Sequence, residues 1–349
     1  MKKSFLFLMC AAVSLVAFAE DEEGKALFES GKAKIAKYDQ GQVSKALGQA
    51  VDAVEMADYL IDGYNDLMKA LPLDTIVETE KDGTPKIDKK TGNVKVKTKY
   101  SKDIVDLIAG HHADFGVAGA TYYDKTDYGK AAAAWELYAS ILPNAEFLGA
   151  KKPVLHDSLA SIYLYYAGLM YSQVAEHDKA ISNFKKSLAR NTTGAVAAQD
   201  IKDGLKYEYY TVSNSYLEAK EYDNSLAVIN DAIATDPDEG FYYMFKGVII
   251  ETQTNDIEDA IDYYKQSIEK DPTLSMGYFN VGRYYYNKAV TTMNAEENMD
   301  LNNDELGKLI DPICKEAKPY IDKSIELDTE NTNAEARRIQ QWLDDRLAN

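Results

Sequence analysis

Two adjacent histidines with an aspartate close by, His111-His112 and Asp114, form the arrangement in this sequence that most resembles a metal site. Imidazole and carboxylate groups are common ligands of zinc and other transition metals. Neighbouring residues on a helix point about 100° apart, however, and neither histidine has another histidine four residues away on its own face. The remaining histidines, His156 and His177, lie far along the chain. We therefore expect packing or surface histidines, and no metal or other cofactor.

The motifs that mark common catalytic sites do not occur in the sequence. It contains no glycine-rich phosphate loop, no Gly-x-Ser-x-Gly turn and no His-Glu-x-x-His pair. Carboxylates are abundant, but abundance in an acidic chain does not define a general acid–base pair. We therefore predict no catalytic residues and a protein that is not an enzyme.

The charge balance limits the kinds of partner. The 349 residues include 57 Asp and Glu against 39 Lys and Arg, a formal charge of −18. Binding to nucleic acid needs a surplus of Lys and Arg for the phosphates, so this balance argues against it, and an anionic membrane surface is disfavoured for the same reason. The 26 Tyr are the unusual feature of an otherwise ordinary globular composition.

Two stretches of the chain repeat one pattern 34 residues apart. Each opens on an aromatic-rich helical segment, beginning at Tyr207 and at Phe241, and continues with a second amphipathic segment. Each closes on Asp-Pro, at Pro237 and Pro272. A period in the thirties built from two helices predicts a repeat array, which grows by adding neighbours and has no single core.

This pattern resembles the tetratricopeptide repeat, a 34-residue pair of antiparallel helices whose units stack into a superhelix. In that family the first helix carries a bulky residue, a small pair and an aromatic. The second helix carries a small residue, an aromatic or aliphatic residue, another small residue and a closing proline. Five units fit this pattern, with the following bulky, small and second-helix aromatic or aliphatic residues: Phe115, Gly119 and Trp135; Leu164, Gly168 and Phe184; Tyr209, Ser213 and Ile229; Tyr243, Gly247 and Tyr264; Tyr278, Gly282 and Ile321.

The resemblance implies an all-α fold, with a tetratricopeptide superhelix of about five helix pairs over residues 102–330. Residues 20–73 are expected to form an N-terminal helical pair or a degenerate first repeat, with helices from Gly24 to Tyr38 and from Gln42 to Leu71. Residues 331–349 are expected to form a C-terminal capping helix, because the end units of a solenoid have one face in water.

Residues 74–101 interrupt the helical pattern. Asp74–Glu80 and Val94–Tyr100 alternate polar and apolar residues around turn-forming Asp-Gly and Thr-Gly-Asn, which predicts a β-hairpin insertion. Lys81–Lys102 holds eight Lys against two Asp, a local charge of +6. Two interpretations follow. The hairpin is a basic finger that contacts an acidic partner, or its Lys strand faces its Glu strand in cross-strand pairs of about 0.2–1 kcal/mol each.

The first 19 residues predict a secretory signal peptide. Lys2-Lys3 supplies a positive start, Phe5–Val16 an apolar run too short for a membrane span, and Ala17-Phe18-Ala19 a small-residue exit before Glu20. Cleavage near Ala19–Glu20 removes two Lys and takes the charge from −18 to −20. We expect a periplasmic or secreted protein without an integral membrane segment.

The cysteines fit this localisation. Cys10 follows Met9, where a lipoprotein signal needs a small residue, so lipidation is disfavoured. Only Cys314 remains in the mature chain, so the mature monomer forms no internal disulfide.

In the tetratricopeptide family one stripe of each first helix faces a concave groove, and the resemblance implies the same stripe here. Aromatic and Met side chains on it suit an extended or helical peptide, since aromatics give contact area at low entropy cost and Met adapts. Asn214 and Asn287 are expected to bind the peptide backbone, and Arg283 a carboxylate. The expected groove residues are Tyr165, Leu169, Tyr207, Tyr210, Asn214, Leu217, Phe241, Met244, Val248, Met276, Phe279, Arg283, Tyr286 and Asn287.

The sequence thus predicts an exported scaffold or adaptor that binds a protein or peptide in an aromatic groove. One alternative is that these side chains pack against each other or against the N-terminal helix. Another is a glycan or small-molecule binding protein that uses the Tyr-rich groove as a stacking platform. The family's chaperone-binding variant clamps a C-terminal carboxylate with several Lys and Arg, and this stripe offers only Arg283.

Overall fold

The computed structural model describes residues 2–74, 76–89, 92–141 and 157–348. Within them the chain is all-α apart from one short pair of strands. The chain divides into two compact units, Met1–Gly204 and Leu205–Asn349, and each is described by itself. The boundary falls inside α8 (Ala198–Glu218).

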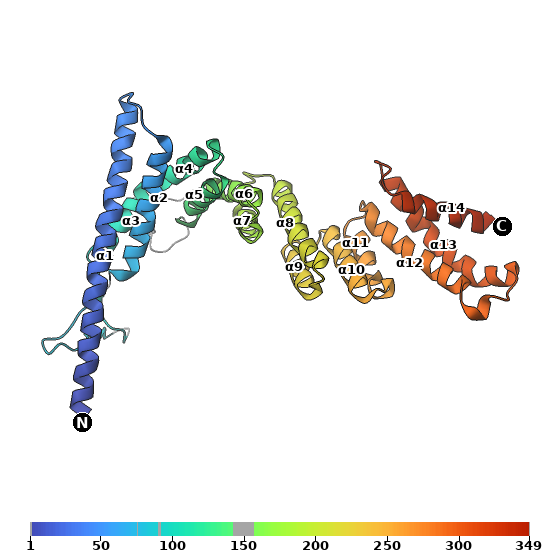
Figure 1. Ribbon diagram of the computed structural model, residues 1–349, viewed down its shortest axis with the longest axis horizontal. Helices are drawn as coiled ribbons and strands as arrows, with labels where there is room; N and C mark the ends of the chain where they lie inside the picture. Colours follow the sequence, from blue (N-terminus) through green and yellow to red (C-terminus); the bar gives the residue numbers. More distant parts are fainter. Residues whose placement is uncertain (1, 75, 90–91, 142–156, 349) are drawn as a thin grey trace. The chain divides into compact units, whose positions relative to one another are not determined.

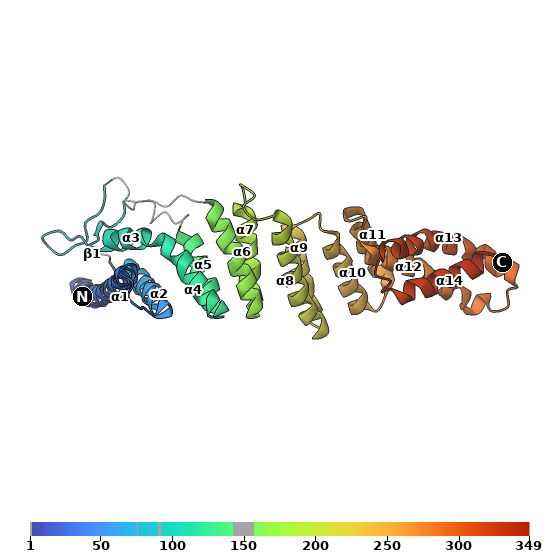
Figure 2. The same ribbon diagram turned by 90° about the horizontal axis from the view of Figure 1, so that it is seen from above.

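The first unit consists of helices joined mostly by short turns (Figure 1). Neighbouring helices pack in pairs, α1 against α2, α4 against α5 and α6 against α7, as Figure 2 shows from above. The elements are α1 (Lys2–Ala46), α2 (Ala53–Ala70), the 3₁₀ turn η1 (Leu71–Leu73), α3 (Ser101–Gly110), α4 (His112–Asp124), α5 (Tyr128–Ile141), α6 (Asp157–Gln173) and α7 (His177–Arg190).

The turn of the N-terminal pair lies later than the sequence predicted. Gly41 does not end the first helix but lies inside α1, where an added Cβ would come within 2.8 Å of the Met56 sulfur. The turn is made instead by Gly48, whose φ of +75° suits glycine. Asp52 then caps α2 by accepting a hydrogen bond from the backbone N–H of Val54 at 2.9 Å. Val43, within the range expected for the second helix, consequently lies on α1, where its side chain is exposed.

The predicted β-hairpin is wrong in its extent. The regular strands are short, β1 (Ile76–Val77) and β2 (Val96–Lys97), two antiparallel strands of two residues each. The chain between them folds back a second time, so that isolated bridges join Thr79 to Pro85 and Ile87 to Val94. Gly83, with a φ of +82°, provides the extra tight turn.

The second unit continues the alternation of helices from the last part of α8. Its interior is a series of small clusters between neighbouring helices, as expected where units stack without a common centre. The elements are α9 (Tyr222–Thr235), α10 (Gly240–Thr254), η3 (Ile257–Asp259), α11 (Ile261–Lys270), α12 (Ser275–Met293), η4 (Glu296–Asn298), α13 (Asn303–Leu327) and α14 (Ala334–Ala348).

Inside the helix pairs, a small residue on the first helix faces a large side chain on the second. Each of these glycines allows close approach, because an added Cβ would lie less than 3 Å from its neighbour. The pairs and Cβ distances are Gly119 and Trp135, 2.3 Å; Gly168 and Phe184, 2.7 Å; Gly247 and Tyr264, 2.6 Å; Gly282 and Ile321, 2.6 Å. Between α8 and α9 the buried hydroxyls of Ser213 and Ser225 each donate to the other residue's carbonyl, at 3.0 and 2.8 Å.

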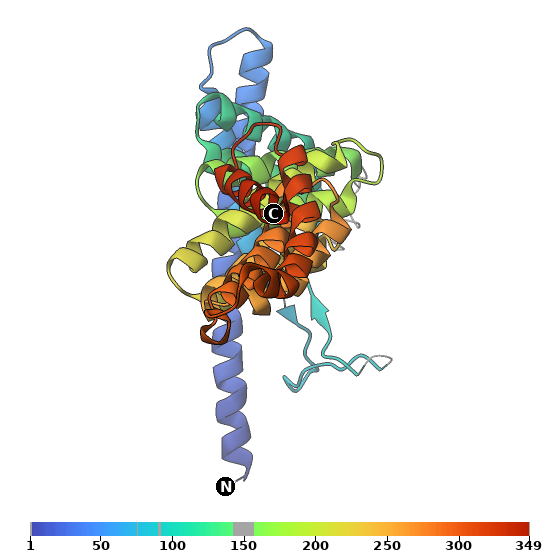
Figure 3. The ribbon, with the colours of Figure 1, turned by 90° about the vertical axis from the view of Figure 1, so that its right-hand side faces the viewer.

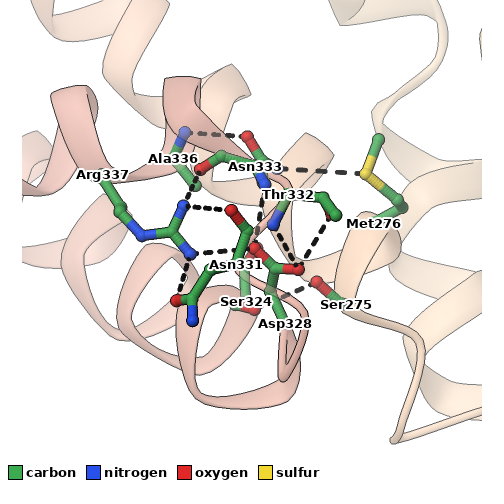
Figure 4. A network of polar contacts seen from close by, with 9 residues as sticks. All are labelled: Ser275, Met276, Ser324, Asp328, Asn331, Thr332, Asn333, Ala336 and Arg337. Carbon is green, nitrogen blue, oxygen red and sulfur yellow. Dashed lines mark hydrogen bonds and ion pairs between the residues drawn. The ribbon is translucent and has the colours of Figure 1, made fainter.

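The segment expected to cap the array forms α14, and a polar turn fixes its start (Figure 4). The Asp328 carboxylate accepts hydrogen bonds from the backbone N–H groups of Thr332 and Asn333 and from Arg337 Nη2, at 3.1, 2.9 and 3.1 Å. The bond from the Asn333 N–H is the main cause that lowers the pKa of Asp328 to about 2. Beyond this turn α14 buries Leu343 in the cluster around Phe279.

Candidate functional site

Tyrosines in the middle of α8 form the most exposed aromatic surface of the second unit. Tyr207 is 60% exposed and Tyr210 is 40% exposed. Asn214 and Leu217 continue the same stripe, because spacings of three and four residues keep side chains on one helix face. Large apolar side chains are normally buried on folding, so a stripe of this kind marks a candidate binding surface.

Aromatic residues of α10 support this stripe. The Tyr210 ring lies 5.8 Å from Phe241 and 5.0 Å from Phe245, in edge-to-face geometry. Phe241 and Phe245 are themselves stacked, with ring planes 4° apart. The sequence reasoning missed Phe245, although its position one helical turn after Phe241 could have revealed it. The α8–α10 surface is defined here as the exposed or half-buried side chains Tyr207, Tyr210, Leu217, Phe241 and Val248.

Two of the expected groove residues lie in the core instead. Met244 is only 7% exposed and packs in the cluster around Tyr264. Phe279 is 6% exposed and packs in the cluster with Ile310 and Leu343 from α13 and α14. Their positions on the helices were predicted correctly, but the helices packed across them cover both side chains. Neither is available to a ligand.

Arg283 already has a carboxylate partner from this chain. Its Nη1 and Nη2 donate to the two carboxylate oxygens of Glu251 at 2.8 and 2.7 Å, and the Tyr264 hydroxyl donates to the same carboxylate at 2.6 Å. Arg283 Nη2 also lies 3.3 Å from Asn280 Oδ1. The expected contact with a ligand carboxylate would have to break this pair, so the structure assigns Arg283 to joining α12 and α10.

The other expected residues of this unit divide between surface and packing. Asn214 donates to Glu218 at 2.8 Å on its own helix. Tyr286 lies edge-on to Trp342 of α14 at 5.1 Å. Met276 is exposed, with its sulfur 3.9 Å from Asn333 Nδ2, and Asn287 is half-buried.

The comparisons with known proteins concern the fold alone. No protein-family model and no curated protein matches this sequence. Among solved structures, a TPR repeats protein from Bacteroides fragilis NCTC 9343 is 15% identical with a TM-score of 0.40, over 67% of this chain and 98% of the other. YrrB, described as a TPR protein with an unusual peptide-binding site, is 14% identical with a TM-score of 0.34, over 70% and 98%.

A third similar structure is described as the TPR2AB-domain:pHSP90 complex of yeast Sti1. It is 15% identical with a TM-score of 0.28, over 96% of this chain and 100% of the other. Superpositions this loose carry no argument about binding. In pair after pair, a small residue of the first helix faces a large side chain of the second, and both residues stand at positions of the family pattern. The helix pairs are of the tetratricopeptide type.

The tetratricopeptide pairs of the first unit carry their own aromatic surface. Rings follow one another at centroid distances of 5.6–6.2 Å from Tyr128 through Tyr123, Trp135, Tyr166 and Tyr165 to Phe184. Tyr123 and Tyr166 are exposed, whereas the expected groove residues Tyr165 and Leu169 are half-buried beside them. Sequence reasoning missed Tyr123 because the groove stripe was assigned from the second pair onward, and it missed Tyr166 although Tyr166 is next to the assigned Tyr165 on α6.

The histidines of the first unit serve packing and polar contacts. His112 is buried and its Nε2 donates to the Tyr138 carbonyl at 2.7 Å. His111 Nδ1 lies 2.9 Å from an Asp114 oxygen, and His111 Nε2 lies 3.5 Å from Asp39. His156 lies outside the described residues.

Metal-ligand clusters and membrane-spanning helices are both absent from the described part of the chain. No three His, Cys, Asp or Glu side chains converge there as metal ligands would. None of the helices there combines the length and the apolar composition that crossing a bilayer requires.

Proposed function

We propose that this protein is a non-catalytic interaction scaffold that binds a peptide segment of a partner protein on the α8–α10 surface. The observation that carries the proposal is the exposure of Tyr207 and Tyr210 beside the aromatic residues of α10. Aromatic side chains presented at a surface are the residues that contribute most to the binding energy at protein interfaces. Rigid helices hold them in place, so little conformational entropy is lost on binding.

The charge of the second unit selects the chemistry of the peptide. Leu205–Asn349 contains 29 Asp and Glu against 14 Lys and Arg, a formal charge of −15. An acidic surface attracts basic partners and repels acidic ones. The expected ligand therefore combines one or two large apolar residues, which cover Tyr207 and Tyr210, with flanking Lys or Arg.

Selection from a random peptide display library against the mature protein tests this proposal. Enriched peptides should be basic and aromatic or aliphatic, and their affinity can then be measured by fluorescence anisotropy. Replacing Tyr207 and Tyr210 together by Ala should weaken binding at least about tenfold, since interface hot spots contribute about 2 kcal/mol or more each. Phe279, although it belongs to the expected groove residues, is left unchanged in this test, because its side chain is in the core.

A matched control is Tyr263→Ala on α11, a half-buried tyrosine outside the α8–α10 surface that Lys246 covers at 4.7 Å. It should leave peptide affinity unchanged. Failure to enrich any peptide, or enrichment of peptides that bind the Tyr207→Ala/Tyr210→Ala variant as tightly as the natural protein, would show that the α8–α10 surface is not the binding site.

The glycan alternative has an observation of its own in the first unit. Tyr123 and Tyr166 present exposed rings on either side of Trp135, at 6.2 and 5.6 Å. Aromatic faces of this kind stack on the apolar faces of sugars. Binding of neutral oligosaccharides on a glycan array, lost in Tyr123→Ala/Tyr166→Ala and kept in Tyr207→Ala/Tyr210→Ala, would favour this second function.

Export is part of the proposal. The positive start, the apolar run and the small-residue exit within Met1–Ala19 support cleavage by signal peptidase. Expression with a C-terminal tag, followed by N-terminal sequencing, should give Glu20 as the first residue of a periplasmic or secreted product. Recovery of the intact N-terminus in the cytoplasm would contradict it.

A further inference from the structure

The Lys-rich insertion has a fixed base. The buried Asp74 carboxylate, at its start, accepts hydrogen bonds from the backbone N–H groups of Lys99, Tyr100 and Ser101 at its end, at 2.9, 2.8 and 2.6 Å. These bonds hold both ends of the insertion at the beginning of α3. Figure 3 shows the ribbon standing out from the helices of the first unit. The term ribbon is used here for residues 76–89 and 92–99, the part of the insertion that the structure describes.

Most lysines of this ribbon face solvent. Glu78 lies 3.6 Å from Lys86 and 3.4 Å from Lys97, so cross-strand pairing of the expected kind occurs at this residue. The side chains of Lys81, Lys89 and Lys95 are exposed. Residues 76–99 hold seven Lys against four Asp and Glu, a formal charge of +3, in a chain whose other residues sum to −21.

Uncovered apolar side chains accompany this charge. Ile87 is 51% exposed, and its bridge partner Val94 is exposed as well. Two-stranded ribbons without a covering layer are marginally stable in water. A ribbon that combines exposed β-branched residues with lysines has the composition of an interface, because the apolar residues supply burial and the charges supply orientation.

The complementary surface occurs in the same sequence, at the α12–α13 loop, defined here as residues 294–305. Glu296, Glu297, Asp300, Asp304 and Glu305 are exposed there, and no Lys or Arg lies between Lys288 and Lys308. Met299 at the tip of the loop is 72% exposed. The loop thus presents both acidic side chains and one large apolar side chain. The ribbon presents the complementary set, lysines together with Ile87 and Val94.

We propose that the ribbon of one copy docks on the α12–α13 loop of a second copy of this chain. The two surfaces differ, so the contact is heterologous and can extend from copy to copy. Both copies carry −18 overall, and this repulsion acts over a longer range than the local attraction. At about 0.1 M salt the Debye length is about 10 Å, which screens the distant charges and retains contacts at close range.

Sedimentation equilibrium of the mature protein tests the contact. At about 0.1 M salt the average mass should exceed that of one chain and rise with protein concentration, and at about 1 M salt it should fall to one chain. Both the ribbon variant Lys81→Gln/Lys89→Gln/Lys95→Gln and the loop variant Glu296→Gln/Glu297→Gln/Asp300→Asn should lose this association at least about tenfold in Kd. These side chains are exposed, so the variants are expected to fold.

Mixing the two variants gives the decisive result. The ribbon variant keeps an intact loop and the loop variant keeps an intact ribbon, so together they should form one-to-one complexes that grow no further. The control variant Lys45→Gln/Lys125→Gln/Lys220→Gln removes three exposed lysines elsewhere and should associate like the natural protein. A mass of one chain at every concentration in 0.1 M salt would overturn the proposal, as would a ribbon variant that associates normally. The readout involves no peptide, so it is independent of the proposed function.

Discussion

Arg283 on α12 and Glu251 on α10 form a two-pronged ion pair, with nitrogen–oxygen distances of 2.8 and 2.7 Å. Each side chain is 22% exposed. A pair in this position lies between an exposed pair, which contributes about 0–1 kcal/mol, and a buried one, whose disruption costs about 3–5 kcal/mol. The pair joins the first helices of two successive repeats and fixes how they stack.

Arg283→Met should therefore lower the free energy of unfolding of the second unit by about 1–3 kcal/mol, because Glu251 loses its partner while it remains mostly buried. Urea unfolding followed by Trp342 fluorescence, in a Trp135→Phe background, measures the change. Arg338→Met is the control, since Arg338 pairs with Glu335 on the surface of one helix and should contribute less than about 0.5 kcal/mol. Equal effects of the two variants would contradict the interpretation.

Gly119→Ala should destabilise the first unit by about 1–3 kcal/mol. The new Cβ would lie 2.3 Å from Trp135 Nε1 and would force α4 and α5 apart. Gly129→Ala, in α5 of the same pair, should instead stabilise by about 0.5–1 kcal/mol, because nothing lies within 4 Å of its added Cβ. Thermal unfolding followed by Trp135 fluorescence, in a Trp342→Phe background, separates the two. If both changes shift the midpoint in the same direction, glycine is not required at the contact.

Asp74→Asn should loosen the base of the ribbon. Burial alone would raise the pKa of Asp74, but the hydrogen bonds from Ser101, Lys99 and Tyr100 outweigh burial and lower it. The carboxylate therefore stabilises the folded state above its unfolded pKa, and this stabilisation is lost as pH falls through the lowered folded pKa. Amide hydrogen exchange at Lys99, Tyr100 and Ser101 should speed up about 30-fold in the variant, for a loss of about 2 kcal/mol. If the exchange rates of these three amides did not change in Asp74→Asn, or if they increased equally in the turn variant Asp82→Asn, the Asp74 carboxylate would not be what holds the base of the ribbon.

His111 should make the stability of the first unit depend on pH near neutrality. The hydrogen bond with Asp114 raises the pKa of His111, burial opposes this, and the charge of Asp39 adds to the increase. His111 therefore contributes fully to the stability of the folded state below its unfolded pKa of about 6.5. This stabilisation disappears as pH rises through the raised folded pKa. Melting temperatures measured from pH 5.5 to 8.5 should fall less steeply for His111→Gln than for the natural protein. Parallel profiles would show that another group is responsible.

The sequence by itself determined the helix pairs. Gly119, Gly168 and Gly247 each meet an aromatic side chain 16 or 17 residues later, at positions of the family pattern. Gly282 meets Ile321, 39 residues later, also at positions of that pattern. The same local periodicity identified the stripe on α8, where Tyr207 and Tyr210 are exposed. Export and the binding partner stay predictions, since nothing in the fold bears on them.

Only the tertiary structure decided which members of the predicted stripe remain accessible. Periodicity states which side chains share a helix face, but exposure depends on what packs across that face from elsewhere in the chain. Phe279 is covered by α13 and α14, and Arg283 is neutralised by Glu251, 32 residues earlier. The Asp74 contacts, about 25 residues apart in sequence, likewise have no local signature. Burial and ion pairing are properties of segments that meet in space, so they were fixed by packing and not by spacing.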